Sequence, residues 1–335
     1  MEIESIKEIN ATNLINNILE HKDKKVCLMV KSNAYGHGLE TVVKIVDKVV
    51  DAYGVVNIEE ALEVRKLTGK RVIIFAPVKD YLTCKDNKIE FMVDSEEAIL
   101  EALECGCKNL LHLAINVGMN RYGVKSEITL KSIYNLLKVK KVKLRSIYTH
   151  FPRTENKSAT KKQYKKFTTL TKCFGDKLPV CFGGSNVHQY NFNFDMIRLG
   201  ICAYGYGDKM KKVLSVKSKI VKINYVCKGE YVGYGKKFFA GKNMFVGIVP
   251  IGYGDGLFRN LSGKFKVKIN GKFYSSVGNI CMDCFFVKID ESVNIGDEVE
   301  VVFDADYLAK ILKTIPYEVL TNLSKLRGVT KIVNY

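Results

Sequence analysis

Short apolar runs alternate with helical stretches over the first two-thirds of this chain, and this alternation limits the fold more than any other feature. Strands separated by helices pair in parallel, because each return to the same edge of a sheet needs a crossover. The stretch 58–68, for example, places Ile58, Leu62 and Val64 at the spacing of a helix packed on a sheet. Strands are expected at 25–30, 53–57, 72–75, 91–94, 110–115, 144–149, 179–182 and 196–199.

Eight strand-and-helix units are the number found in a TIM-type (β/α)8 barrel. An open, doubly wound sheet shows the same alternation but usually contains fewer strands. We therefore predict an α/β fold whose first part, residues 1–212, is a (β/α)8 barrel.

The sequence pattern changes after this region. From Val213 onward, valine, isoleucine and aromatic residues alternate with lysine and glycine, and turn signals such as Asn270-Gly271 are frequent. Such alternation between closely spaced turns is typical of β-hairpins. We predict a mainly β C-terminal domain at 213–335, interrupted by one short helix near 307–313.

The composition is that of an ordinary globular protein, with 47% hydrophobic and 26% charged residues among 335. No apolar stretch approaches the ~18 residues of a membrane span, and the opening MEIESIKEIN lacks the apolar region of a secretory signal. The ten cysteines are scattered, as in reduced proteins of the cytoplasm, where we place this chain. Their two close spacings, Cys105–Cys107 and Cys281–Cys284, lack the second pair or the histidines of a zinc site, so no metal is expected.

The formal net charge of +18 raises the question of a nucleic-acid partner. Basic residues are spread along the whole chain, however, with local clusters only at 138–145 and 161–166. Dispersed lysine favours solubility and the attraction of small anions over a surface that reads nucleic acid. We expect small-molecule partners, and neither nucleic acid nor a membrane.

A lysine directly follows the first expected barrel strand. The apolar run Val26–Val30 leads into Lys31, and the carboxyl ends of barrel strands form the active site of this fold. A lysine at that place can lose its proton by desolvation and attack a carbonyl to form a Schiff base. The alternative is a solvated lysine at the end of a strand, which is the commoner situation for any single lysine.

The string KSNAYGHG at 31–38 closely resembles the cofactor-lysine motif of the alanine racemase family, which uses pyridoxal 5'-phosphate (PLP). The resemblance implies a PLP-binding barrel with a C-terminal β domain, and an isomerase that interconverts L- and D-alanine by a two-base mechanism. Six further segments match the family in order along nearly the whole chain: NIEEA at 57–61, GMNRYG at 118–123, YTHF at 148–151, IRLGI at 197–201, GYGDG at 252–256 and CMD at 281–283.

The resemblance also implies which residues hold the cofactor. Lys31 carries PLP, and Tyr35 reaches its phosphate. The backbone N–H groups of Gly200 and Ile201 and the hydroxyl of Ser185 complete the phosphate site. Loops after the last two strands of barrels commonly bind phosphate in this way.

Arg198 is expected, by the same resemblance, to face the pyridine nitrogen of the cofactor. An arginine does not readily give up a proton, so the ring nitrogen stays unprotonated. The ring is then a weaker electron sink, which favours the return of a proton to the substrate over transamination. The alternative for Arg198 alone is a surface charge, and the neighbouring LGI sequence argues against it.

Racemisation needs a base on each face of the substrate's α carbon. The resemblance assigns these roles to Lys31 and Tyr253. It implies that His150 modulates Tyr253 and is also one of the cofactor-binding residues. Because a tyrosine has an unperturbed pKa of about 10, positive charge nearby must favour its phenolate. In the family this tyrosine enters the active site from the partner subunit, which implies a homodimer with shared sites.

The substrate carboxylate is expected to bind Arg121 and the backbone N–H of Met282. Two features depart from the family pattern. Ala114 and Asn116 occupy positions where many relatives have a lysine and an aspartate, so another group must orient Arg121. The segment 323–327 contains no tyrosine to match the one that relatives place near cofactor and substrate.

These departures leave the substrate range open. Serine, or a broad set of amino acids, is the alternative to alanine, and a PLP-binding barrel without racemase activity is the less favoured one. D-alanine for the bacterial cell wall is the role that the family implies, but the sequence alone does not separate a biosynthetic role from a catabolic one.

Overall fold

The computed structural model describes residues 5–175, 178–184 and 186–334, and its internal contacts divide the chain into two compact units. The first, here called the barrel unit, contains residues 14–31 and 42–210. The second, the sheet unit, contains the chain up to residue 13, residues 32–41 and the chain from 211 onward.

Eight parallel strands form a closed barrel in the first unit, which confirms the predicted fold class. Closure is achieved where the last strand pairs with the first, with Lys25 opposite Met196 and Leu28 opposite Leu199. Nearly every strand residue is buried, as expected where a strand has packed side chains on both faces. The strands are β2 (Lys25–Met29), β3 (Ala52–Val55), β4 (Arg71–Ile74), β5 (Glu90–Val93), β6 (Leu111–Ala114), β7 (Ser146–His150), β8 (Val180–Gly183) and β9 (Met196–Leu199).

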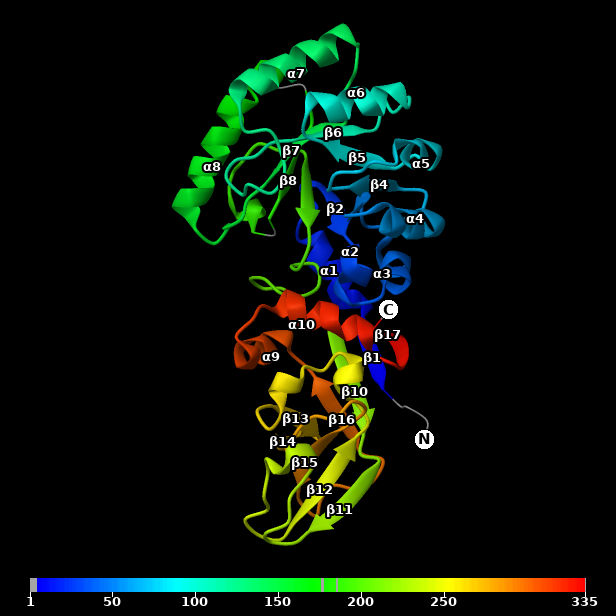
Figure 1. The fold of residues 1–335 in the computed structure, drawn as a ribbon, viewed down its shortest axis with the longest axis vertical. Coiled ribbons are helices and arrows are strands. Elements are labelled where there is room, and N and C mark those ends of the chain that lie inside the picture. Colours follow the sequence, from blue (N-terminus) through cyan, green and yellow to red (C-terminus); the bar gives the residue numbers. More distant parts are fainter. Residues whose placement is uncertain (1–4, 176–177, 185, 335) are drawn as a thin grey trace. The chain divides into compact units, whose positions relative to one another are not determined.

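Helices lie around the outside of the barrel (Figure 1). Several begin at a side-chain cap, in which Asn57, Ser95 or Ser126 accepts the backbone N–H three residues further on. The helices are α4 (Ile58–Leu67), α5 (Tyr81–Asp86), α6 (Glu96–Glu104), α7 (Glu127–Val139) and α8 (Lys157–Leu170), while α1 (Ala11–Leu19) and α3 (Leu39–Val46) each contribute residues to both units.

The sheet unit is built on nine strands in the order β11-β12-β15-β14-β13-β16-β10-β1-β17. Most neighbours are antiparallel, and the predicted Asn270-Gly271 turn joins the β13–β14 hairpin. Two helices follow the hairpins, α9 (Ala305–Leu312) and α10 (Pro316–Asn322). The strands are β1 (Ile6–Asn10), β10 (Leu214–Lys219), β11 (Lys222–Val226), β12 (Met244–Val249), β13 (Lys266–Ile269), β14 (Lys272–Val277), β15 (Phe285–Ile289), β16 (Glu298–Val302) and β17 (Val329–Val333).

Strand β1 lies within the sheet of the second unit although it opens the chain. It pairs antiparallel with β10 and parallel with β17. A division of the sequence at 212 and 213 therefore does not describe how this strand packs. Its five residues, IKEIN, alternate in burial like any strand of a sheet with one covered face, and nothing in them indicates which sheet they join.

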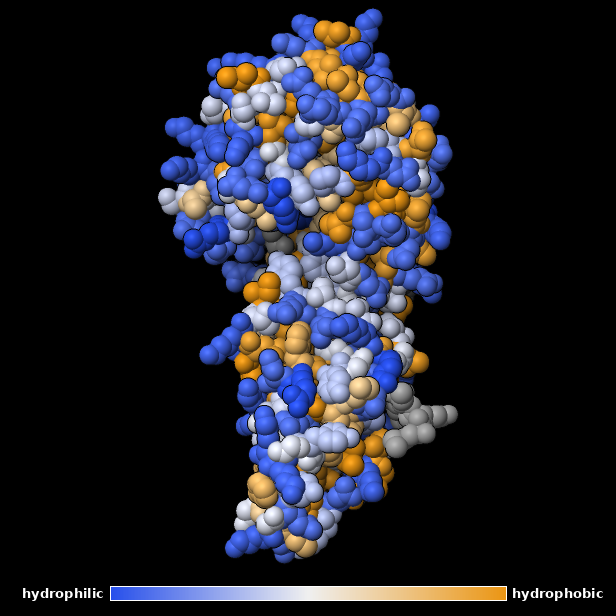
Figure 2. All heavy atoms as spheres, in the orientation of Figure 1, coloured by the Kyte–Doolittle hydropathy of each residue, from blue (hydrophilic) through white to orange (hydrophobic). Residues whose placement is uncertain are grey.

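Hydrophilic side chains are spread over the drawn face of both units, with small apolar areas between them (Figure 2). This distribution agrees with the dispersed charge of the sequence. Within the described ranges, no helix is both long and apolar enough to cross a membrane.

Candidate active site

Lys31 lies directly after the carboxyl end of β2, as the sequence predicted. The strand ends at Met29, the N–H of Val30 donates to the carbonyl of Gly54 at 2.9 Å, and Lys31 follows half-buried. Burial lowers the pKa of its amine, the positive charge of Arg121 lowers it further, and Glu60 opposes the shift. A lysine held this way releases its proton more readily than a solvated one, which suits attack on a carbonyl.

A left-handed helical turn follows Lys31. Ser32, Asn33, Ala34 and Tyr35 all have φ between 52° and 54°, a conformation that L-residues rarely adopt in succession. The N–H of Gly36 donates to the carbonyl of Ser32 at 3.1 Å and closes the turn. The side chain of Asn33 accepts the N–H that begins α3, from Leu39, at 2.7 Å.

Residues from both ends of the sheet unit hold this turn. The buried Lys7 of β1 donates from Nζ to the carbonyl of Gly36 at 2.8 Å. Gly36 also packs so closely against α10 that a Cβ there would lie 1.9 Å from the carbonyl oxygen of Leu320. The ring of Tyr35, the predicted phosphate ligand, is buried with its centre 5.9 Å from that of Tyr317.

Arg198 on β9 is buried inside the barrel and held by four groups. Its Nη2 donates to the carbonyl oxygen of Thr149 at 2.9 Å, and its Nη1 lies 3.7 Å from Sγ of Cys181. Its guanidinium carbon lies 4.6 Å from the ring centres of both Phe75 and Tyr148. The two aromatic faces stabilise the cation, because each carries negative charge density.

His150, at the end of β7, lies beside the same arginine. A Cβ placed on Gly183 of β8 would be 2.5 Å from Nδ1 of His150 and 2.2 Å from Nη2 of Arg198, so only glycine fits between them. Burial, followed by the positive charges of Arg198, Arg121 and Lys31, lowers the pKa of His150 to about 3. The imidazole is therefore neutral at physiological pH.

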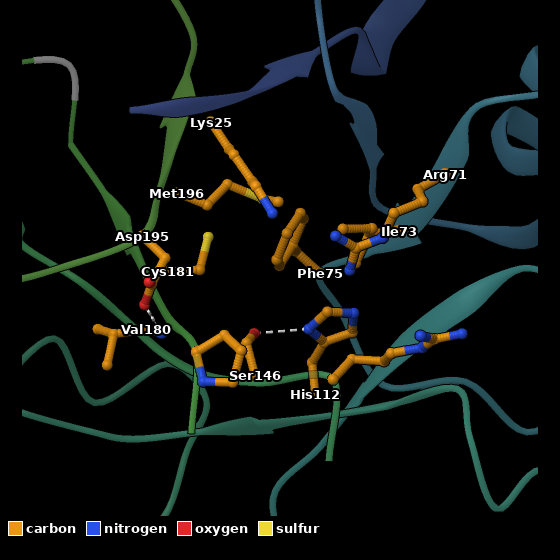
Figure 3. Close-up of a pocket in the computed structure, with 12 residues that line it drawn as sticks. Lys25, Arg71, Ile73, Phe75, His112, Ser146, Val180, Cys181, Asp195 and Met196 are labelled. Carbon is orange, nitrogen blue, oxygen red and sulfur yellow. Dashed lines mark hydrogen bonds between the residues drawn. The ribbon is translucent and has the colours of Figure 1, made fainter. Parts of the chain in front are cut away.

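A polar network lies at the amino end of the barrel. The buried carboxylate of Glu90 accepts from Nε and Nη2 of Arg71 at 2.9 and 2.7 Å, and from Nε2 of His112 at 2.7 Å. Burial opposes ionisation of Glu90, but these hydrogen bonds outweigh it and lower its pKa to about 2. Nδ1 of His112 bonds in turn to the hydroxyl of Ser146 at 2.7 Å (Figure 3).

This network borders a pocket of about 110 Å³ (Figure 3). Phe75 and Cys181, which both contact Arg198, point into the same pocket. The amino end of a TIM-type barrel normally serves stability, while the opposite end carries the chemistry. The network therefore lines the same pocket as Phe75 and Cys181, two of the residues that hold Arg198.

The loop after β9 offers a place for a phosphate. In the described part of the chain, neither Gly200 nor Ile201 donates its backbone N–H to another group, although both residues are buried. Buried N–H groups without an acceptor are costly, so a ligand with acceptor oxygens fits there. The predicted ligand Ser185 lies outside the described residues.

The loop that carries Arg121 is organised by Asn116. The side-chain oxygen of this buried asparagine accepts the N–H groups of Gly118 at 2.9 Å and Asn120 at 3.2 Å. Ala114 closes the loop by accepting the N–H of Val124 at 2.9 Å. Asn116, one of the two departures from the family pattern, therefore fixes the loop from within, and Arg121 itself is exposed.

Tyr253 lies in the sheet unit, on the short 3-10 turn η4 (Tyr253–Asp255). Its N–H donates to the carbonyl of Cys281 at 3.0 Å, and the N–H of Gly254 donates to that of Met282 at 2.9 Å. Met282, the predicted ligand of the substrate carboxylate, and Tyr253, the predicted second base, therefore lie on adjoining loops. Tyr253 and Met282 are 41% and 55% exposed.

The predicted site residues fall into two groups. Lys31, Arg121, His150 and Arg198 interact electrostatically within the barrel unit. Tyr253 and Met282 adjoin each other in the sheet unit. Among the described residues, no cluster of three histidine, cysteine or acidic side chains could hold a metal ion.

Sequence reasoning missed the aromatic pair around Arg198. Tyr148 stands in the YTHF segment that was singled out, and Phe75 directly follows an expected strand, but neither position indicates a shared partner. Only the fold brings the two rings, whose centres are 5.2 Å apart, together beside one guanidinium.

Comparison with known proteins extends over nearly the whole chain. The family models described as alanine racemase, N-terminal domain, and alanine racemase, C-terminal domain, match residues 9–208 and 213–330. The chain is 33% identical to the alanine racemase of Borreliella burgdorferi, over 95% of this chain and 94% of that protein.

Solved structures give the same result. The chain is similar to the alanine racemase of E. faecalis, with a TM-score of 0.91, 25% identity and 98% of both chains covered. The alanine racemase of Bartonella henselae, solved with covalently bound pyridoxal phosphate, shares the fold with a TM-score of 0.88 at 24% identity, over 98% of this chain and 99% of that one.

Proposed function

This chain belongs to the alanine racemase family and is a PLP-dependent enzyme that interconverts L- and D-alanine, and from this premise we propose which residues perform the reaction. Lys31 holds the cofactor and serves as the base on one face of the substrate's α carbon. Tyr253 serves as the base on the other. The observation that carries this proposal is the placement of Lys31 at a barrel strand end, with its pKa lowered by burial and by Arg121.

The residues around Lys31 fit the cofactor. PLP, when bound, withdraws electrons from the α carbon and so makes its hydrogen removable. The backbone N–H groups of Gly200 and Ile201 would bind the phosphate, and Tyr35 and Ser185 would complete that site. Arg198 is fixed by two rings and two hydrogen-bond acceptors, and it would hold the ring nitrogen of the cofactor unprotonated, because a guanidinium keeps its proton.

The proposed roles imply a path for the proton. Nζ of Lys31, neutral at the moment of reaction, takes or returns the α hydrogen on its face. The phenol oxygen of Tyr253 does the same on the opposite face, and neutral His150 adds no positive charge beside the lysine. Arg121 and the N–H of Met282 hold the substrate carboxylate, so that the α carbon lies between the two bases.

We further propose a homodimer in the cytoplasm. The exposed Tyr253 and Met282 are suited to enter the active site of a second copy, which supplies Lys31 and Arg198. The ten free cysteines accord with a reducing compartment. We retain 1–212 and 213–335 as the cofactor-binding and C-terminal domains in terms of function, with β1 as the strand that joins the second sheet.

Replacement of Tyr253 by phenylalanine tests the two-base assignment. Racemisation should fall by about 10²–10⁴-fold, the value of a positioned base. The variant should still exchange the α hydrogen of D-alanine, which faces Lys31, while it loses exchange of L-alanine. Deuterium incorporation in heavy water, followed separately for each enantiomer by mass spectrometry, measures this difference.

Borohydride reduction provides the control for cofactor binding. Peptide mapping should place the reduced pyridoxyl group on Lys31 in both the wild type and the Tyr253→Phe variant. Equal residual exchange from both enantiomers would show that one base serves both faces, and the assignment of Tyr253 would be wrong.

A further inference from the structure

We propose that Arg327 is a positioning residue that fixes Tyr253 and Met282 relative to each other and thereby sets the geometry of the second base. This inference rests on the proposed function, since it assigns Arg327 a role through the two residues that the proposal places at the substrate. Arg327 lies in the segment where the family's tyrosine has no counterpart, and sequence reasoning gave it no role.

The guanidinium of Arg327 joins two acidic side chains. Its Nε and Nη2 donate to the two carboxylate oxygens of Asp255 at 2.8 and 3.0 Å, which is a bidentate pair. The same Nη2 donates to Asp283 at 2.8 Å. Asp255 ends the turn that begins with Tyr253, and Asp283 directly follows Met282, so one planar group connects the two loops.

Asp255 is the fixed end of this connection. It is fully buried, and it also accepts the N–H of Gly252 at 2.9 Å and the N–H of Arg327 at 3.3 Å. Burial opposes its ionisation, but the hydrogen bonds from Arg327 and Gly252 outweigh burial and lower its pKa. Because Gly252 and Asp255 flank Tyr253 and Gly254, the buried carboxylate holds the turn at both ends.

Asp283 is the exposed end. Its side chain is 66% exposed and that of Arg327 is 45% exposed, so this branch alone has little effect on stability. The Asp283 branch instead orients a loop. The carbonyls of Cys281 and Met282 in this loop accept the N–H groups of Tyr253 and Gly254.

The backbone around Arg327 is itself anchored. Two residues further on, Val329 donates its N–H to the carbonyl of Ser5 at 3.1 Å, where β17 joins β1. On the other side, the amide of Asn322 at the end of α10 donates to the carbonyl of Gly256 at 2.7 Å. Arg327 therefore connects the turn of the exposed Tyr253 to the β1–β17 edge of the nine-stranded sheet.

Three variants test the role of Arg327. Arg327→Lys keeps the charge opposite Asp255 but cannot join both acids in one plane, and Asp283→Asn weakens only the exposed branch. Lys268→Met is the matched control, since it removes a partly exposed ion pair with Glu300 elsewhere in the same sheet. Thermal unfolding and borohydride mapping to Lys31 establish that each variant is folded and binds PLP.

Displacement of Tyr253 should slow proton transfer only on the face of the α carbon that Tyr253 serves. We expect Arg327→Lys to lower α-hydrogen exchange from L-alanine by about 10²-fold, because a misplacement of about 1 Å costs that much. Asp283→Asn should lower it by about tenfold in the same assay. All rates are measured at saturating alanine, where weaker binding of the carboxylate by Met282 does not limit exchange. Exchange from D-alanine, and all exchange in Lys268→Met, should then stay within about twofold of the wild type.

Tyr253→Phe is assayed beside them to separate two kinds of failure. If Tyr253→Phe affects both enantiomers equally, the two-base proposal fails. If Tyr253→Phe affects L-alanine alone while both Arg327→Lys and Asp283→Asn leave the ratio of the two exchange rates unchanged, Arg327 does not position the base. Should Arg327→Lys fail to fold, Asp283→Asn leaves the buried pair intact and decides the question.

Discussion

Arg198 is a buried cation in the barrel interior, and no carboxylate of the described residues forms an ion pair with it. Two aromatic faces, one carbonyl oxygen and one thiol replace the usual acidic partner. A carboxylate would neutralise the guanidinium and could accept a proton, whereas rings and a carbonyl leave its charge in place. The surroundings thus preserve the property on which the proposed role depends.

Replacement of Arg198 by glutamate should change the outcome of the reaction. An acid facing the ring nitrogen favours its protonation, so we expect racemisation to fall more than about tenfold, which is about 1.4 kcal/mol in the barrier. Release of pyruvate, the transamination product of alanine, should rise in the same samples. Chiral chromatography and a pyruvate assay measure the two reactions.

Arg198→Lys is the control for lost packing, because it keeps a smaller cation beside the two rings. It should slow racemisation without raising pyruvate release. An unchanged ratio of the two reactions in Arg198→Glu would mean that Arg198 does not face the ring.

The positions of three proposed site residues at strand ends could be predicted from the sequence. Lys31, His150 and Arg198 each end or follow an apolar run, and a parallel barrel brings such ends to one side. The residues that hold Arg198 could not be predicted, since Phe75 follows β4 while Tyr148 and Cys181 lie on β7 and β8, and these side chains meet only in the interior of the closed barrel.

At the scale of elements, the turn after Lys31 differs most from expectation. The string KSNAYGHG predicted a cofactor lysine by resemblance, but nothing in it indicated four successive left-handed residues. Such a conformation costs roughly 1–2 kcal/mol for each residue other than glycine. Contacts from Lys7 and Leu320 offset this cost, and both lie too far away in sequence to be associated with the turn.

Replacement of Asn33 by alanine should reveal this strain. Asn33 accepts the N–H of Leu39 and tolerates a positive φ better than most residues, so its loss removes a cap and raises the strain. We expect a loss of about 2 kcal/mol in unfolding free energy, measured by urea denaturation. Ser95→Ala, which removes the cap of α6 from an extended residue, should cost only about 1 kcal/mol. Equal losses in the two variants would argue against strain at Asn33.

Elements whose partners are close in sequence were predicted, and elements whose partners are distant were not. The barrel strands pair in chain order, so the alternating pattern was sufficient to predict them. Strand β1 pairs with β10 and β17, which are more than 200 residues away, and its own sequence carries no signal for them.

For the whole molecule, buried histidines make stability depend on pH. Burial is the main cause that lowers the pKa of His37 to about 3 and that of His21 to about 4, against an ordinary value of 6.5. A histidine with a lowered pKa stays neutral in the folded state but gains a proton on unfolding. Its contribution to stability is complete above pH 6.5 and is lost as the pH falls toward the folded pKa.

The fully buried His37 should account for about 2 kcal/mol of the stability lost between pH 7 and pH 5. In His37→Asn, the difference between urea unfolding free energies at these two pH values should be smaller by that amount. If the difference between the unfolding free energies at pH 7 and pH 5 is the same in His37→Asn as in the wild type, His37 is not the source of the pH dependence.

The chain passes between the barrel unit and the sheet unit near residues 13, 31, 41 and 210. A hybrid gene made from two relatives with one crossover near residue 212 would combine β1 and the turn at 32–35 from one parent with β10, β17 and α10 from the other. The contacts of β1 with its two neighbouring strands, and of Gly36 with Leu320, would then join sequences that never evolved together. The two halves of this enzyme are therefore poor modules for recombination, and their evolutionary unit is the whole chain.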